Sequence, residues 1–313
     1  MNLAALLVHL SRIKLLIACI LASSTVVGET QDDFNLSEVV SGVFVHHGRH
    51  AGLEHADRAD SANIGFIIGN GCVAVIDSGG SVDIGVKLLT AIRERTKVRI
   101  CYVINTHAHF DHILGNAAFL SEQPKFIGHV NLATAINNSR DYFAKNFSAE
   151  LGDRGGAGVI GPDTLVEAEL VLDLGGRELR LAAQPMAHTD SDLTVVDLQT
   201  NTLWSGDLVF MERLPVLDGN LRGWLAWMTT SAARSYDRVI PGHGPTTAPW
   251  PAALLAQQAY LTSLVATVKS ALAAGEFLED VTASGENALL PGWEIPTAHT
   301  RNLSRAYREY EWE

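Results

Sequence analysis

Cysteine is scarce in this sequence, and so are basic side chains. The 313 residues include three cysteines, too few for a disulfide-stapled fold or for a zinc site of four thiolates. Lysine and arginine number 23 against 35 aspartates and glutamates. This acidic balance argues against a protein that binds nucleic-acid phosphates across a broad surface. Hydrophobic residues make up 47% of the chain, which excludes a disordered protein.

A short apolar run with a basic flank lies near the N-terminus. Arg12 and Lys14 precede residues 15–22, and small residues separate this run from Glu29. The pattern is typical of a secretory signal peptide, and we place it at residues 1–28. The run is shorter than the ~20 residues that span a bilayer. No later stretch is long and apolar enough either. We therefore expect a soluble periplasmic or secreted protein without stable membrane insertion.

Residues 29–313 contain no proline- or serine-rich linker and no short repeat, which predicts one domain. Apolar runs at 63–77 flank a Gly-Asn-Gly turn and predict a hairpin. Helical periodicity follows at 82–95, a continuous apolar run predicts a strand at 98–105, and a further strand is predicted at 165–172. This order predicts an α/β protein in which two βα halves pack as sheets inside helical layers.

Two cysteines remain in the exported chain. Cys72 and Cys101 each lie near the start of a predicted strand. They could pair in an oxidising compartment if those strands are neighbours. The sequence favours the alternative, in which both are buried, unpaired thiols that act as small hydrophobes.

The densest chemical signal is a cluster of histidines directly after the strand at 98–105. Here His107, His109, Asp111 and His112 lie within six residues. Loops at the carboxyl ends of strands are where α/β folds place their ligands. His107 and His109 can converge on one metal, while Asp111 and His112 turn toward a second.

Three more isolated segments offer suitable ligands, each just past a strand-like run. They contain His188, Asp207 and His243, and glycines beside Asp207 and His243 permit sharp turns. Imidazole and carboxylate ligands without thiolate suit Zn²⁺, with Mn²⁺ or Fe²⁺ also possible. Seven such side chains exceed one closed tetrahedral site, so we expect open positions for water.

In order and spacing these residues resemble the motifs of the metallo-β-lactamase superfamily. The resemblance covers nearly the whole exported chain and implies an αβ/βα four-layer sandwich with a two-metal site at the sheet edges. It implies one zinc held by His107, His109 and His188, a second held by Asp111, His112 and His243, and a bridge between them at Asp207. It also implies that Asp77 orients the ligand loop through hydrogen bonds.

The chain departs from true metallo-β-lactamases at two positions. Asp207 stands where their first subclass has a cysteine, and Phe210 where it has a lysine that holds the antibiotic's carboxylate. A β-lactamase stays an alternative, because Arg213 could supply that charge. The bridging aspartate is similar to the glyoxalase II type of site. However, with 70 residues after His243, we do not expect the long helical domain that grips glutathione in that family.

A narrower resemblance lies in the flanking segments. Residues 46–67, 187–195, 204–210 and 310–313 resemble the quinoprotein relay system zinc metallohydrolases. Members of that family are exported and accompany quinone-cofactor dehydrogenases and c-type cytochromes. This resemblance implies a functional link to such a system.

The combined prediction is an exported dinuclear zinc hydrolase acting on a small molecule, with no nucleic-acid partner. A metal-bound hydroxide attacks an ester, thioester, lactone or amide carbonyl, β-lactams included. We predict that Asp111 orients this nucleophile or carries its proton. His50, in a histidine-rich loop, and Arg213 are predicted substrate contacts. The remaining alternatives are a mononuclear iron sulfur dioxygenase and a metal-binding accessory protein without activity.

Overall fold

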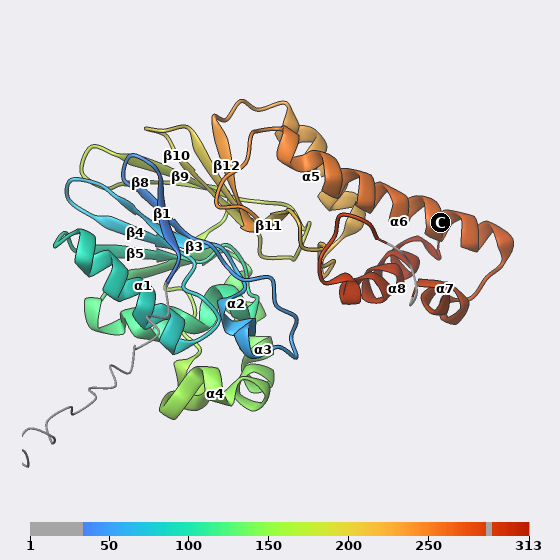
Figure 1. The fold of residues 1–313 in the computed structure, drawn as a ribbon, viewed down its shortest axis with the longest axis horizontal. Helices are drawn as coiled ribbons and strands as arrows, with labels where there is room; N and C mark the ends of the chain where they lie inside the picture. Colours follow the sequence, from blue (N-terminus) through green and yellow to red (C-terminus); the bar gives the residue numbers. More distant parts are fainter. Residues whose placement is uncertain (1–33, 286–289, 313) are drawn as a thin grey trace, which may run out of the picture. The chain divides into compact units, whose positions relative to one another are not determined.

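Two β-sheets form the centre of the structure (Figure 1). The computed structural model describes residues 34–285 and 290–312, so the predicted signal peptide at 1–28 lies outside the described residues. The strands of the first sheet are β1 (Leu36–Val40), β2 (Val43–His46), β3 (Ile64–Ile68), β4 (Val73–Ile76), β5 (Ile100–Ile104), β6 (Lys125–His129) and β7 (Thr164–Val166). Those of the second sheet are β8 (Glu169–Asp173), β9 (Glu178–Ala183), β10 (Leu193–Asp197), β11 (Thr202–Phe210) and β12 (Arg238–His243).

Each sheet has a parallel part. In the first, β1 to β4 pair antiparallel in sequence order, and β4 to β7 pair in parallel. In the second, whose order is β12-β11-β10-β9-β8, only β11 and β12 run parallel among the described strands. Parallel neighbours place their carboxyl ends at one edge of the sheet, where α/β folds bind ligands.

Helices cover the outer faces of both sheets (Figure 1). The α-helices are α1 (Val82–Arg95), α2 (Phe110–Ile113), α3 (Leu132–Asn146), α4 (Ser148–Leu151), α5 (Leu221–Ala232), α6 (Leu255–Ala274), α7 (Leu278–Gly285) and α8 (His299–Tyr310). Short 3₁₀ segments are η1 (Ala56–Asp60), η2 (Leu114–Glu122), η3 (Gly152–Gly158), η4 (Ala252–Leu254) and η5 (Pro296–Ala298). None of the described helices is long and apolar enough to span a membrane.

The alternation of side chains along β4 shows how the layers form. Val73 and Val75 pack toward α1, whereas Ala74 and Ile76 face the second sheet, and all four are fully buried. Successive residues of a strand point to opposite faces, so a strand covered on both sides is apolar throughout. Full burial of a valine or isoleucine contributes roughly 1.5–3 kcal/mol. The helix–sheet–sheet–helix order confirms the predicted αβ/βα sandwich.

The prediction of one strand at 165–172 is wrong. The chain crosses between the sheets here, because β7 pairs with β6 in the first sheet and β8 pairs with β9 in the second. The exposed Glu167 and Ala168 lie at the crossing point. A strand-like sequence indicates extended backbone but not the sheet with which that backbone pairs, so the pattern could not reveal the break.

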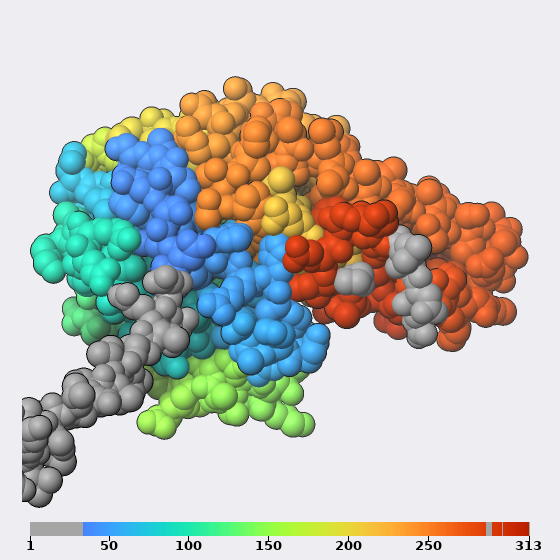
Figure 2. Space-filling view, viewed as in Figure 1, coloured from blue at the N-terminus to red at the C-terminus, as the bar shows by residue number. Residues whose placement is uncertain are grey.

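The C-terminal part of the chain folds back toward the segment that precedes η1. His50 Nδ1 lies 2.9 Å from Glu294 Oε2, and the space-filling view shows the C-terminal segment (red) beside the segment around residue 50 (blue) (Figure 2). A short bridge between Arg213 and Glu294 joins the same region to the loop after β11. These contacts bring α8 close to the carboxyl ends of the second sheet's parallel strands.

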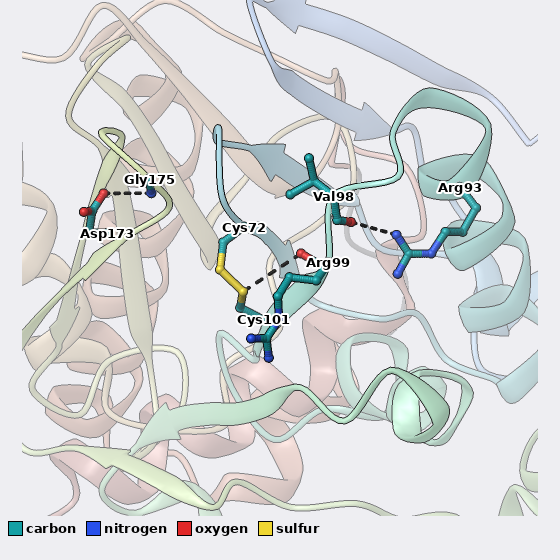
Figure 3. The surroundings of a disulfide bond; sticks show 7 residues. All are labelled: Cys72, Arg93, Val98, Arg99, Cys101, Asp173 and Gly175. Atoms are coloured by element: carbon teal, nitrogen blue, oxygen red, sulfur yellow. Dashed lines mark hydrogen bonds between the residues drawn. A yellow bond between two sulfur atoms is a disulfide. The ribbon is translucent and has the colours of Figure 1, made fainter.

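The favoured prediction of unpaired thiols is also wrong. Cys72 and Cys101 form a disulfide across the parallel pair β4 and β5 (Figure 3). Their Cα atoms are 5.6 Å apart, a separation that disulfide geometry accepts. Pairing depended on β4 and β5 being neighbours, which the sequence left open.

Removing this disulfide is expected to destabilise the fold. The bond joins residues separated by 29 positions, and a loop of that size corresponds to roughly 2–4 kcal/mol of unfolding free energy. The double variant Cys72→Ala/Cys101→Ala should therefore unfold at a lower urea concentration, as followed by circular dichroism. Wild-type protein unfolded under reducing conditions is the control and should show the same loss. An unchanged midpoint in both experiments would contradict the prediction.

Candidate metal centre

Four of the parallel strands bring polar residues to one place. Asp77 directly follows β4, and the loop 105–109 follows β5 and leads into α2. In the second sheet, Asp207 lies within β11 and His243 ends β12. His188 joins them from the loop between β9 and β10. The topology thus gathers residues that are as many as 166 positions apart in the sequence, from Asp77 to His243.

The seven predicted ligands lie in two groups. The groups are His107, His109, His188 and Asp207, and Asp111, His112 and His243. Within each group one nitrogen or oxygen per residue lies within 4.8 Å of the others, and each group could hold a metal ion. All seven are buried except His109, which is partly exposed.

Asp207 lies at the centre of both groups. Its Oδ2 is 3.6 Å from His107 Nε2, 3.5 Å from His188 Nε2 and 3.3 Å from His243 Nε2. Its Oδ1 is 3.2 Å from His112 Nε2. A carboxylate with both oxygens facing imidazole nitrogens has the geometry of a bridge between two cations.

Hydrogen bonds hold three of the rings with Nε2 turned inward. The Nδ1 atoms of His188 and His243 lie 2.7 and 2.8 Å from the carbonyl oxygens of Val216 and Ser61. His112 Nδ1 lies 2.8 Å from Asp77 Oδ2. A proton on each Nδ1 leaves the Nε2 lone pair available for a metal, which is how protein acceptors fix the tautomer of a ligand histidine.

His109 has the opposite orientation. Its Nε2 lies 2.9 Å from Asp218 Oδ2, and its Nδ1 lies 3.1 Å from His188 Nε2 inside the cluster. Asp218 in turn pairs with Arg301 and Arg305 of α8. Asp218 is therefore an orienting residue that the sequence did not indicate. Its contact with His109 spans 109 positions, and the segment around Asp218 carries no recognisable motif.

Asp77 organises the loop that follows β5. Its two carboxylate oxygens accept hydrogen bonds from the backbone N–H and the hydroxyl of Thr106, each at 2.8 Å. Thr106 Oγ1 lies 3.0 Å from His107 Nδ1, so one chain of hydrogen bonds links Asp77 to both His107 and His112. Asp77 adopts φ 55°, a left-handed conformation that a non-glycine residue rarely adopts without such support.

Glycine is required at position 206 for two reasons, the conformation of the backbone and the closeness of Thr106. It adopts φ 52°, and a Cβ at this position would lie 2.6 Å from both Cβ and Oγ1 of Thr106. The sequence-based expectation of a sharp turn beside Asp207 agrees with this conformation.

A Gly206→Ala substitution is expected to lower the unfolding free energy by roughly 3 kcal/mol, because it adds a steric clash to the left-handed strain. Gly275 is a matched control, since it also has positive φ (74°) but has no neighbouring atom within 4 Å of the position that a Cβ would take. Gly275→Ala should cost only about 1 kcal/mol. Equal thermal unfolding of the two variants would contradict the role of the Thr106 contact.

Burial and mutual charge set the protonation of the cluster. Burial would raise the pKa of Asp207, but the surrounding His243, His112 and His107 outweigh it and hold that pKa well below its usual range. Burial lowers the pKa of His188 to about 3. For His112, burial would lower the pKa, but Asp207, Asp77 and Asp111 raise it well above the usual value. Ionised carboxylates and neutral imidazoles are the forms that bind metals, and a metal would displace the proton on His112.

The cluster has buried polar atoms that lack protein partners. Among the described residues, His107 Nε2, His112 Nε2 and Asp207 Oδ1 have no hydrogen bond. Leaving such atoms unsatisfied in the interior costs free energy. A metal bound at the two groups would satisfy them, and the imidazole and carboxylate donors suit zinc, manganese or iron.

The predicted substrate contacts are placed differently. Arg213 lines a cavity beside the cluster, with Nη1 3.1 Å from His243 Nδ1 and 3.9 Å from Asp111 Oδ2. Asp111 lines the same cavity, and its Oδ2 accepts a 2.7 Å hydrogen bond from Ser61. His50 is not among the residues that line this cavity; it pairs with Glu294.

Solved structures with the same fold include β-lactamases. A metallo-beta-lactamase from Pontibacter korlensis is 20% identical, with a TM-score of 0.58, and the match covers 72% of this chain and 98% of that chain. TMB-1 is 19% identical, with a TM-score of 0.58, and the match covers 73% of this chain and 96% of that chain.

A sulfatase also has this fold. The stereoselective inverting sec-alkylsulfatase Pisa1 from Pseudomonas sp. is 17% identical with a TM-score of 0.61. The match covers 88% of this chain and 50% of that chain, so the present chain spans half of the sulfatase's length.

No curated protein matches this sequence. A family model described as the metallo-beta-lactamase superfamily matches residues 57–243, which is more than half of the chain and includes all seven residues of the two groups. With the two-sheet fold, this match confirms the prediction of a hydrolase of this class: the chain belongs to the metallo-beta-lactamase superfamily.

Proposed function

We propose that this protein is an exported dinuclear zinc hydrolase that cleaves an ester, thioester, lactone or amide bond of a small molecule. The observation that carries the proposal is the position of Asp207. Its carboxylate lies 3.2–3.6 Å from four imidazole nitrogens that belong to both groups. One carboxylate shared in this way favours two metal ions over one.

The two groups would each hold one ion. His107, His109 and His188 would bind the first, Asp111, His112 and His243 the second, and Asp207 both. When bound, the ions would supply hydroxide at neutral pH and positive charge toward a developing oxyanion.

Asp111 is the residue that we propose to handle the proton. Its side chain reaches the cavity, and Ser61 fixes one of its oxygens by a hydrogen bond. Burial would raise the pKa of Asp111, but His112 and His243 outweigh it and lower that pKa. The group is therefore an ionised carboxylate that can orient an attacking water and accept its proton. The Phe210 ring stacks on the His243 ring, with 4.9 Å between the ring centroids, and so excludes water from that side of the imidazole.

Several features bear on the alternatives. The fold is shared with β-lactamases, but the buried Phe210 offers no positive charge for an antibiotic's carboxylate. Arg213 in the cavity wall would have to supply it. A mononuclear iron dioxygenase would not need the complete second group of Asp111, His112 and His243.

We also propose that the protein is exported and acts with a quinoprotein dehydrogenase system. The Cys72–Cys101 disulfide supports an oxidising compartment, where such bonds persist. The predicted signal peptide at residues 1–28 supports the periplasm or the exterior. The link to a quinoprotein dehydrogenase or a cytochrome c rests on the sequence resemblance in the flanking segments.

Metal analysis combined with a hydrolysis screen tests the proposal. Purified protein should contain two zinc ions per chain and hydrolyse at least one member of a panel of 4-nitrophenyl esters, thioesters, lactones and cephalosporins. Chelation should abolish turnover and zinc should restore it. One iron with sulfite production would instead support the dioxygenase, and bound metal without any turnover would support the accessory protein.

A further inference from the structure

A cavity of about 530 Å³ opens over the candidate metal centre. One part of its wall is apolar, with Phe143 of α3 and Phe147, which precedes α4. Leu53, Tyr142 and Met186 continue this wall and are 47%, 53% and 51% exposed. Large apolar side chains left this exposed around one cavity indicate a surface that binds an apolar ligand.

Another part of the wall is cationic. Arg301 and Arg305 of α8 line the cavity, one helical turn apart on one helix face. Each side chain is half exposed. Their shared partner Asp218 contacts His109, so a single carboxylate separates these arginines from the metal centre.

With the candidate metal ligands left out, the lining of the cavity has a net charge opposite in sign to that of the whole chain. Apart from the candidate metal ligands, the lining has Arg213, Arg301 and Arg305 against Asp190 and Asp218. The wall thus has one net positive charge in a protein whose formal net charge is −12. Such a local reversal of sign at a cavity favours an anionic ligand.

The contacts with Asp218 do not use all the N–H donors of Arg301 and Arg305. A guanidinium has five N–H donors in a plane that matches a carboxylate, sulfonate or sulfate group. Arg301 donates to one oxygen of Asp218, and the nearest approach of Arg305 to the same oxygen is 3.8 Å. The packing of α8 depends on other residues, since Leu303 and Ala306 are buried in the hydrophobic core.

We infer that the substrate is an amphipathic anion, with its apolar body against the aromatic wall and its acidic group on Arg301 and Arg305. The bond to be cleaved then lies between these two parts, over Asp207 and Asp111. This inference rests on the proposed hydrolase function and specifies its substrate class.

Binding of a ligand that cannot be hydrolysed separates this inference from the hydrolase proposal. Octane-1-sulfonate combines an alkyl chain with an anion, ethanesulfonate has the anion with almost no chain, and 1-octanol has the chain without the charge. Calorimetric titration of the metal-loaded protein should show that octane-1-sulfonate binds at least tenfold more tightly than either comparator.

Two variants and a matched control locate the contacts. Arg305→Gln should weaken octane-1-sulfonate binding about fivefold, since a half-exposed charge pair contributes modestly. Arg308→Gln removes an exposed arginine of the same helix that does not line the cavity, and it should leave the affinity unchanged. Tyr142→Ala should weaken octane-1-sulfonate but not ethanesulfonate.

The outcomes distinguish the two proposals. If 1-octanol binds as tightly as octane-1-sulfonate, or if Arg305→Gln behaves like Arg308→Gln, the substrate class is wrong even when the protein hydrolyses esters. If the sulfonate binds as expected but the hydrolysis screen finds no turnover, the amphipathic anion site stands and the hydrolase proposal fails.

Discussion

An Asp207→Asn variant is expected to lose roughly three orders of magnitude in kcat/KM for any substrate found in the screen. In the native protein both oxygens of this carboxylate face imidazole nitrogens of the two groups. Asparagine keeps one acceptor oxygen but replaces the other with an NH₂ donor, which cannot bind a metal. We therefore expect the zinc content to fall from two ions per chain to one or fewer.

Metal analysis and kinetics on the same preparation check this prediction. Asparagine has nearly the same size as aspartate, so circular dichroism should show a folded protein. Asp141→Asn is a suitable control, because Asp141 is exposed on α3 and its substitution should change neither zinc content nor rate. A folded Asp207→Asn variant with two zinc ions and a full hydrolytic rate would contradict both the bridge and the proposed mechanism.

Part of the metal centre could be predicted because its residues are close together in the sequence. The His107–His112 segment combines four candidate ligands behind one apolar strand, and chemistry alone suggests a metal there. His188, Asp207 and His243 are isolated, so their assignment depended on the family resemblance. The structure brings Asp207 and His243 together because β11 and β12 are parallel neighbours, and His188 joins them from the loop between β9 and β10.

The parts that sequence did not predict arise from tertiary contacts. Asp218 and Arg301 lie in segments without a motif, and their contact exists only because α8 packs beside the loop after β11. The disulfide likewise required the order of β4 and β5 in the sheet. Apolar runs and turn residues indicate where strands occur, but the pairing of distant strands depends on the packing of the whole domain.

Substituting Asp77 is expected to have the second largest effect, although this residue is in neither metal-binding group. Asp77 accepts hydrogen bonds from Thr106 and from His112 Nδ1. In Asp77→Asn, the amide has only one acceptor oxygen, so Thr106 and His112 can no longer all be satisfied. An NH₂ group facing His112 Nδ1 would place the ring proton on Nε2, which is the nitrogen that faces Asp207.

The change should therefore appear as weaker metal binding. Loss of a hydrogen bond that orients a ligand histidine typically costs roughly 10- to 100-fold in metal affinity or activity. Asparagine tolerates the left-handed conformation of Asp77, so the variant should stay folded, whereas Asp77→Ala would lose both the acceptors and this tolerance. Zinc titration with activity as readout should show the rate of Asp77→Asn recovering as free zinc rises. The rate of Asp207→Asn should not recover, because there a ligand atom itself is missing. A rate for Asp77→Asn that stays low at saturating zinc would assign Asp77 to a step other than metal binding.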